Sequence, residues 1–185
     1  MVVSGIGKAN AAGATSRFAD PLRHGRLLSV GVGGSLPGSD LALGSVIAAT
    51  TCVFADEGVQ TPTGFMDCHA MGFPLGDFPG SRIPADPDVL NWLKPLCDAT
   101  GPVATVSTCS GTDSLAAAVQ TRTGAVVEAM EGAAVALVAR RLDIPCGELR
   151  VVSNTTGDRP NQQWDIRGAL DRLGAVIGRL AAAAP

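Results

Sequence analysis

Apolar runs of strand length alternate along the chain with segments of helical periodicity. The apolar runs are rich in β-branched residues and bounded by glycine, which predicts strands at residues 26–34, 44–55, 101–111, 124–130 and 147–158. The segments before, between and after them predict helices at residues 8–19, 86–99, 112–123, 132–142 and about 163–184. Such alternation is typical of an α/β fold, in which helices cover a largely parallel sheet.

The stretch from Gly58 to Pro87 interrupts this alternation. It contains TPTG, GFPLGDFPG and IPADP, whose glycines and prolines break regular structure. We therefore expect a long loop, and loops of this length in compact proteins often carry function.

Composition limits the class of protein. Of the 185 residues, 46% are hydrophobic and 17% are charged, which excludes a disordered chain and allows one domain over residues 1–185. The 14 basic and 17 acidic residues give a net charge of −3, and nothing indicates the basic stripe of a nucleic-acid-binding protein. We expect a small-molecule partner and no nucleic acid.

Cysteine usage and hydropathy bear on cofactors and location. The five cysteines are scattered without a CxxC pair or a histidine cluster, so we expect reduced packing residues, no metal and no cofactor. No apolar run reaches the roughly 20 residues of a membrane span, and the N-terminus has no secretion signal. The sequence predicts a cytoplasmic protein without a membrane partner.

Two carboxylates stand in the apolar segment GAVVEAMEGAAVALVARR, residues 124–141. Glu131 shares a helical stripe with four apolar residues, Ala134, Val135, Val138 and Leu142. Its side chain is therefore expected to point inward at the end of a strand, where α/β folds bind ligands. The alternative is that Glu131 only complements the helix dipole, but an unpaired buried charge is costly without a partner or ligand. For Glu128 we expect no special role.

Polar residues crowd the end of another predicted strand, in VVSNTTGDRP, residues 151–160. Asn154 and Asp158 there fit turn residues that bond their own backbone, or ligand contacts. In STCSGTD, residues 107–113, the polar groups either cap the following helix or aim backbone N–H groups at a ligand. Both alternatives stay open for each segment.

Four segments carry a joint signal through their order along the chain: SGIGKANAA, GVGGSLPGSDLALGSVIAATT, EAMEGAAVALVARRLDIP and RVVSNTTGDRPNQQWDI. Together they resemble the nucleoside phosphorylase superfamily, specifically its nucleosidase branch, which cleaves methylthioadenosine and adenosylhomocysteine. Within that branch, FADEGVQTPTGF and SNTTGDR are similar to the futalosine hydrolases, which remove hypoxanthine from futalosine in menaquinone synthesis. The resemblance covers residues 2 to about 173. It implies a three-layer α/β/α sandwich around a mixed, largely parallel sheet.

The resemblance also implies hydrolysis of an N-ribosidic bond through a transition state with positive charge on the ribose, chemistry that glycosidases manage with carboxylates. By this resemblance, Glu131 holds the ribose hydroxyls and faces the developing charge where water is excluded. Met130 packs against the sugar, and Gly33 and Gly34 lie where backbone approaches the ligand. The segment beside the purine corresponds to Ser110, Gly111 and Thr112.

The position after Ser153 bears on the leaving base. Relatives that release adenine have an aspartate there, whereas this chain has Asn154. An amide offers a donor and an acceptor, so its NH₂ group can bond O6 of a 6-oxopurine while its oxygen accepts from protonated N7. A mismatched base leaves a buried polar group unpaired, so Asn154 favours hypoxanthine over adenine. Trp164 either packs on the core or forms an aromatic wall for the benzoate end of futalosine.

The pattern departs from the family in one respect. Relatives usually begin with a further strand whose end supplies an acid that positions the attacking water, and no residue of MVVSGIGKA matches it. We therefore expect the natural protein to extend upstream, and neither Asp56 nor Glu57 takes this role on spacing alone.

Other functions remain open on the sequence. One is a 6-oxopurine nucleoside phosphorylase, with Lys8 and Arg82 as candidate phosphate ligands. Another is a methylthioadenosine-type nucleosidase, and a third is a non-catalytic purine-nucleoside binding protein. Relatives commonly form homo-oligomers, which we also expect here.

Overall fold

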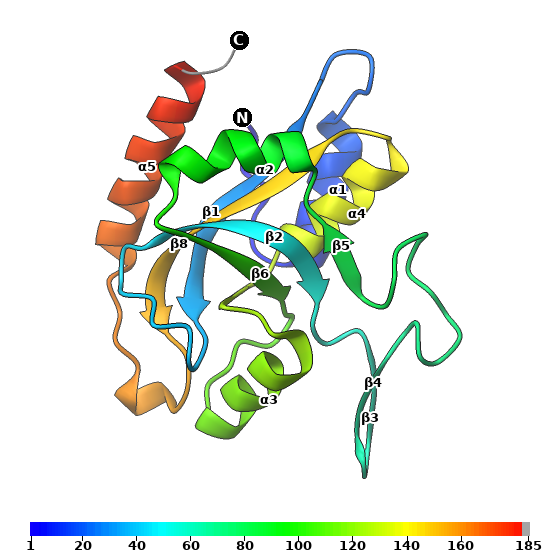
Figure 1. The fold of residues 1–185 in the computed structure, drawn as a ribbon, viewed down its shortest axis with the longest axis vertical. Helices are drawn as coiled ribbons and strands as arrows, with labels where there is room; N and C mark the ends of the chain where they lie inside the picture. The colour runs from blue at the N-terminus through cyan, green and yellow to red at the C-terminus, as the bar shows by residue number, and fades with distance from the viewer. Residues whose placement is uncertain (183–185) are drawn as a thin grey trace.

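Within residues 1–182, which the computed structural model describes, a six-stranded mixed sheet forms the centre of the molecule (Figure 1). Its strands, in spatial order, are β5 (Arg82–Pro84), β2 (Val46–Phe54), β6 (Ala99–Thr105), β7 (Val127–Ala129), β1 (Leu27–Ser35) and β8 (Cys146–Thr155). The pairs β1–β8, β2–β6 and β6–β7 are parallel, whereas β1–β7 and β2–β5 are antiparallel. The sheet curls so far that β2 also pairs with β8.

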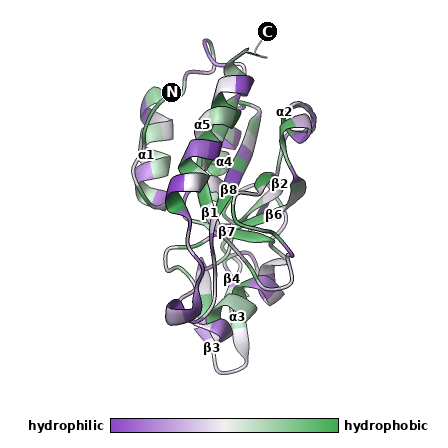
Figure 2. Ribbon diagram, turned by 90° about the vertical axis from the view of Figure 1, so that its left-hand side faces the viewer, coloured by the Kyte–Doolittle hydropathy of each residue, from purple (hydrophilic) through white to green (hydrophobic). Residues whose placement is uncertain are grey.

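Helices cover both faces of this sheet. On one side, α1 (Lys8–Phe18) packs against α4 (Gly132–Arg141), and on the other lie α2 (Pro87–Leu93) and α5 (Ile166–Ala182) (Figures 1 and 2). The helix α3 (Asp113–Thr123) lies at the edge toward which β1, β2 and β6 run (Figure 1). Short 3₁₀ helices cover Lys94–Leu96 and Arg159–Asn161. The α/β fold and its layers are confirmed.

The two faces of the sheet are buried separately. Side chains alternate between the faces of a strand, so in β2 the residues Ile47 and Ala49 join the cluster beneath α1 and α4. Val46 and Ala48 join the cluster beneath α2 and α5. Burial on both sides explains why the strands read as continuous apolar runs rather than alternating ones.

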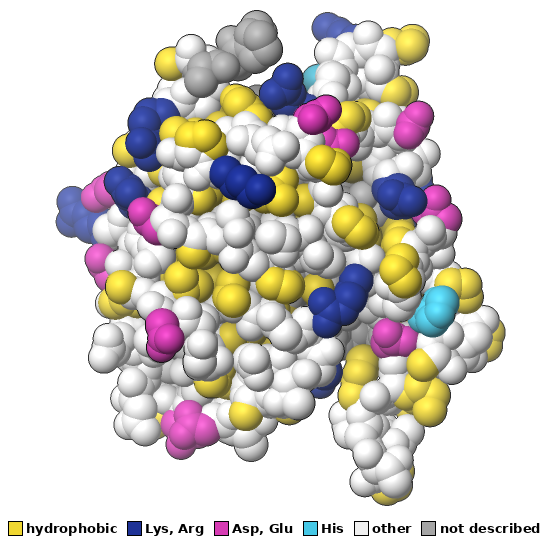
Figure 3. Space-filling model, viewed as in Figure 1, with side chains coloured by type: hydrophobic (Ala, Val, Ile, Leu, Met, Phe, Trp, Pro, Cys, Tyr) yellow, Lys and Arg dark blue, Asp and Glu magenta, His cyan; other side chains and the backbone are white. Residues whose placement is uncertain are grey.

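The expectation of a long loop between Gly58 and Pro87 is wrong in part. Gly58–Thr61 (β3) and Gly64–Asp67 (β4) form a hairpin that projects from the body (Figure 1), and a third piece of this stretch supplies β5. Of the Pro and Gly residues that indicated a loop, Pro62 lies in the two-residue turn between these strands, and Gly64, with φ of +138°, begins β4 directly after it. A cavity of about 390 Å³ separates hairpin and body (Figure 3). Arg82, a candidate phosphate ligand, lines it, but the residues expected to bind the nucleoside do not.

The remaining differences concern boundaries. The last helix begins at Ile166 rather than near Gln163, because the preceding residues pair with β8 instead. Its expected end at Ala184 lies outside the described residues. Four strands are shorter than expected: β2 and β8 by a few residues, and β6 and β7 more markedly. None of the helices in the described part of the chain is long and apolar enough to cross a membrane.

Candidate active site

The expected site residues gather at the edge of the sheet where β1 and β8 end (Figure 1). In the parallel pair β1–β8, Gly34 lies opposite Asn154, and in the antiparallel pair β1–β7 the same glycine lies opposite Glu128. Because β7 leads directly into α4, the topology brings Asn154 and the segment around Glu131 to the two sides of one glycine. Sequence reasoning placed these groups together, and the sheet order explains why.

Glu131 lies at the N-cap position of α4, but its side chain makes no capping hydrogen bond. Instead, Oε1 accepts from the Gly7 N–H at 3.0 Å, and Oε2 accepts from Arg150 Nη1 at 3.1 Å and from the Met130 N–H at 3.3 Å. The side chain is 18% exposed. The carboxylate therefore points inward and is held by a charge-assisted hydrogen bond. These contacts go beyond the alternative that Glu131 only complements the helix dipole.

Arg150 is the partner that sequence reasoning missed. Its guanidinium is buried, and besides Glu131 it donates from Nε to Glu148 Oε1 at 2.8 Å and from Nη2 to Ser29 Oγ at 2.9 Å. Burial alone lowers the pKa of Arg150, but the charges of Glu148 and Glu131 outweigh burial and raise it. The available signal was an acid and a base two residues apart in the apolar run GELRVV, since buried charges occur mostly in pairs.

Gly132 allows α4 to begin over this ion pair. A β-carbon at Gly132 would lie 2.0 Å from Oε2 of Glu148, well inside van der Waals contact. The glycine after Glu131 is thus required by the packing of the Arg150–Glu148 pair beneath the helix.

Glu128, for which we expected no special role, is a buried anchor. Its Oε1 accepts from the Ser110 N–H at 2.7 Å and its Oε2 accepts from Ser110 Oγ at 2.6 Å. Burial raises the pKa of Glu128, and the two bonds from Ser110 only partly offset this. The expectation failed because a strand residue next to an apolar run gave no sign that its partner would come from a loop eighteen residues upstream.

The segment Ser110 to Thr112 is fixed at both ends. Thr112 caps α3, with Oγ1 accepting from the Leu115 N–H at 3.2 Å, so the capping alternative is confirmed for this residue. The Ser110 N–H is engaged by Glu128 rather than free for a ligand. The carbonyls of Ser110 and Gly111 accept from Gln162 Nε2 and the Arg159 N–H, which joins this segment to the chain after β8.

Asn154 is half-buried and its amide is oriented by neighbours. Its Oδ1 accepts from Ser153 Oγ at 2.8 Å, and its Nδ2 donates to the Thr155 carbonyl at 2.9 Å. A β-carbon at Gly34 would lie 2.8 Å from Nδ2, and one at Gly33 would lie 2.6 Å from the side chain of Val127. Both glycines therefore permit close strand packing around Asn154, whether or not a ligand approaches them.

The chemistry available at this edge is that of carboxylates, an amide and a buried guanidinium. Within residues 1–182, no group of three or more His, Cys, Asp or Glu side chains could hold a metal ion. The five cysteines are free thiols. Burial, together with the charge of Glu148, raises the pKa of Cys146 to about 12.

Known proteins with similar sequences show which family the chain belongs to. The sequence signature of the phosphorylase superfamily matches residues 1–184. A futalosine hydrolase from Acidothermus cellulolyticus is 35% identical over 190 residues, covering 99% of this chain and 75% of the relative. One from Streptomyces coelicolor is 33% identical, covering 98% and 77%. The chain belongs to the futalosine hydrolase family.

Solved structures place this futalosine hydrolase family member among the nucleosidase folds. A 5′-methylthioadenosine/S-adenosylhomocysteine nucleosidase from Neisseria meningitidis, in complex with methylthio-immucillin-A, superposes with a TM-score of 0.80 at 21% identity, covering 98% of this chain and 80% of that one. An S-adenosylhomocysteine nucleosidase from Streptococcus pyogenes gives 0.79 at 21%, covering 98% and 78%. At these identities the likeness concerns the fold alone.

Proposed function

We propose that this chain hydrolyses the N-ribosidic bond of futalosine and releases hypoxanthine. The observation that carries the proposal is the convergence at one sheet edge of an oriented carboxylate, Glu131, and an oriented amide, Asn154. The futalosine hydrolases that are 33–35% identical to the chain support the same reaction.

In the proposed reaction, Glu131 accepts hydrogen bonds from the ribose hydroxyls and its negative charge faces the positive charge that develops on the sugar. Arg150 and the Gly7 N–H hold the carboxylate in place from the protein side. Met130, directly before it, packs against the sugar. Such fixed charges contribute most where they need no reorganisation during the reaction.

Asn154 recognises the leaving base. As water adds its hydroxyl group to C1′ and releases its other proton to solvent, the C1′–N9 bond breaks and its electron pair leaves with the purine. The purine takes up a proton from solvent at N7, so that the reaction consumes one water molecule in total. The amide oxygen of Asn154 has a second lone pair besides that used by Ser153, and its nitrogen has a second hydrogen besides that given to Thr155. These remaining groups accept from N7–H and donate to O6, which matches hypoxanthine.

The side chains expected to bind phosphate are engaged elsewhere, which favours hydrolysis over phosphorolysis. Lys8 Nζ forms ion pairs with Asp56 and, at 3.3 Å, with Glu57. Arg82 donates to the Thr123 carbonyl. A phosphorylase would have to free one of these groups. The homo-oligomer and the cytoplasmic location stay predictions.

Turnover with and without phosphate tests the proposal. The purified chain is incubated with futalosine in phosphate-free buffer, and hypoxanthine is measured by chromatography. We expect release at a rate that added phosphate does not change. A rate that depends on phosphate would establish phosphorolysis, and calorimetric binding of futalosine without hypoxanthine release would establish a non-catalytic binding protein.

A further inference from the structure

The chain after β8 folds back along the strand end that carries Asn154. The Thr155 N–H donates to the Gln163 carbonyl at 3.0 Å, and the Asp165 N–H donates to the Ser153 carbonyl at 2.8 Å, so Trp164 lies directly opposite Asn154 in an antiparallel bridge. Residues opposite each other in such a pair project to the same face, with β-carbons about 4.5–5.5 Å apart. Trp164 is therefore a neighbour of Asn154 on the face that we assign to the substrate.

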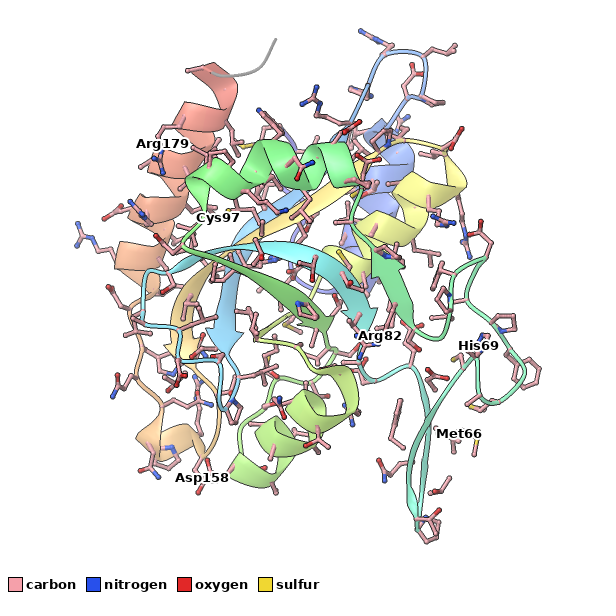
Figure 4. All side chains as sticks on the ribbon, in the orientation of Figure 1. Met66, His69, Arg82, Cys97, Asp158 and Arg179 are labelled. Carbon is pink, nitrogen blue, oxygen red and sulfur yellow. The ribbon has the colours of Figure 1, made fainter. Side chains whose placement is uncertain are left out.

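Trp164 is not a core residue. The residue is 47% exposed. The guanidinium of Arg159 stacks over its indole ring, and the central carbon of the guanidinium lies 4.5 Å from the ring centroid. Asp158, the residue before Arg159, is labelled in Figure 4 and shows where this segment lies in the fold. Of the two roles considered for Trp164, packing on the core is wrong.

Gln162 holds both members of this stack in place. Its Oε1 accepts from Trp164 Nε1 at 3.1 Å and from Arg159 Nη1 at 3.0 Å. Its Nε2 donates to the carbonyls of Ser110 and Gly157 at 3.0 and 2.8 Å. The ring and the cation are thus oriented before any ligand arrives, which lowers the entropic cost of binding, and they are tied to the segment beside the expected purine position.

The guanidinium of Arg159 has capacity to bind an anion. In the part of the chain that the structure describes, no carboxylate lies within 4.0 Å of it. One of its N–H groups is used by Gln162, and the planar fork that remains matches a carboxylate. A partly exposed indole beside a guanidinium with no ion-pair partner among the described residues is a combination suited to an aromatic ring that carries a carboxylate.

We propose that Arg159 and Trp164 form a binding site for the benzoate group at the non-purine end of the nucleoside, with Trp164 stacking on the ring and Arg159 pairing with its carboxylate. The inference rests on the proposed function, because it requires that Asn154 takes the purine. It makes Arg159 a specificity-determining residue, which selects futalosine over nucleosides without a carboxylate.

The test is a cycle that changes Arg159 and the substrate carboxylate independently. Wild type and Arg159→Gln are each assayed for kcat/KM with futalosine and with its methyl ester, in which the carboxylate is neutral. We expect Arg159→Gln to lower kcat/KM for futalosine by about tenfold or more, mainly through KM, as for loss of a charge-assisted hydrogen bond. With the ester we expect less than a twofold difference between the two proteins. Arg167→Gln, an exposed arginine at the start of α5, is the matched control and should behave as wild type.

The outcomes separate the inference from the proposed function. A wild-type chain that releases no hypoxanthine from futalosine overturns both. If wild type turns over futalosine and Arg159→Gln retains its KM, only the benzoate site is refuted. An equal loss with futalosine and with the ester would show that Arg159 contacts the purine or the loop instead, and this too would overturn the inference. Trp164→Leu adds a second readout. It should lower kcat/KM for futalosine and for the ester by the same factor, and so leave the preference for the carboxylate unchanged.

Discussion

Removing the charge of Arg150 should destabilise the folded chain strongly. Arg150→Met keeps the length of the aliphatic stem but leaves Glu148 with no cation beside it. The two side chains are 3% and 0% exposed, and Oε2 of Glu148 already has no hydrogen-bond partner within the described residues. Bulk water therefore does not contact the Glu148 carboxylate.

The magnitude follows from this burial. Breaking a buried ion pair by removing one partner costs about 3–5 kcal/mol, a large share of the roughly 5–15 kcal/mol that stabilises a typical domain. Replacing both charges with apolar groups is often neutral. We therefore expect Arg150→Met combined with Glu148→Leu to recover most of the loss.

Urea unfolding followed by circular dichroism measures the effect. With a slope of about 2 kcal/mol per molar urea, Arg150→Met should lower the midpoint by roughly 1.5–2.5 M. The matched control is Arg140→Met, which removes an ion pair with Asp77. The two side chains are 44% and 76% exposed, so we expect little change in the urea midpoint. Equal losses in the two variants, or a double variant less stable than Arg150→Met, would refute the reasoning.

Three further predictions follow from the site. Asn154→Asp should shift preference toward 6-aminopurine nucleosides, and unchanged relative kcat/KM for the two bases would argue against Asn154 reading the base. Because burial raises the folded-state pKa of Glu128 above 4.5, its contribution to stability is greatest below that value and is lost as pH rises through the folded-state pKa. Urea unfolding between pH 4 and 7 should therefore show that Glu128→Gln removes this loss, whereas an unaltered pH slope would contradict it. Gly132→Ala should lower stability by about 1–3 kcal/mol through overlap with Glu148, while Gly178→Ala on α5, with open space around the added carbon, should raise it slightly; a thermal melt compares them.

The periodicity of the chain was enough to predict the sheet, the helices and the α/β class, because burial on both faces makes β2 and β8 continuous apolar runs. It failed at the β3–β4 hairpin, because Pro62 and Gly64 are typical loop residues, yet Pro62 lies in a two-residue turn and Gly64 pairs with Thr61 across it. Local composition indicates a turn but does not determine whether the residues on its two sides pair as strands.

The candidate site was predicted unevenly for a related reason. Glu131 and Asn154 were found because each stands at the end of an apolar run. Arg150 and Glu128 were missed because their importance depends on partners far along the chain, 19 residues from Arg150 to Glu131 and 18 from Glu128 to Ser110. Hydrogen-bonding partners between distant segments depend on sheet order, which periodicity does not determine.

The central claim is that Glu131 acts on the ribose during release of hypoxanthine. Its most direct test is single-turnover hypoxanthine release from futalosine by wild type and Glu131→Gln, with the exposed Asp171→Asn on α5 as the matched control. We expect Glu131→Gln to slow the chemical step by about a hundredfold or more, equivalent to roughly 2.7 kcal/mol, while its thermal midpoint stays near that of wild type and Asp171→Asn is unaffected. A folded Glu131→Gln variant that releases hypoxanthine at the wild-type rate would contradict the account.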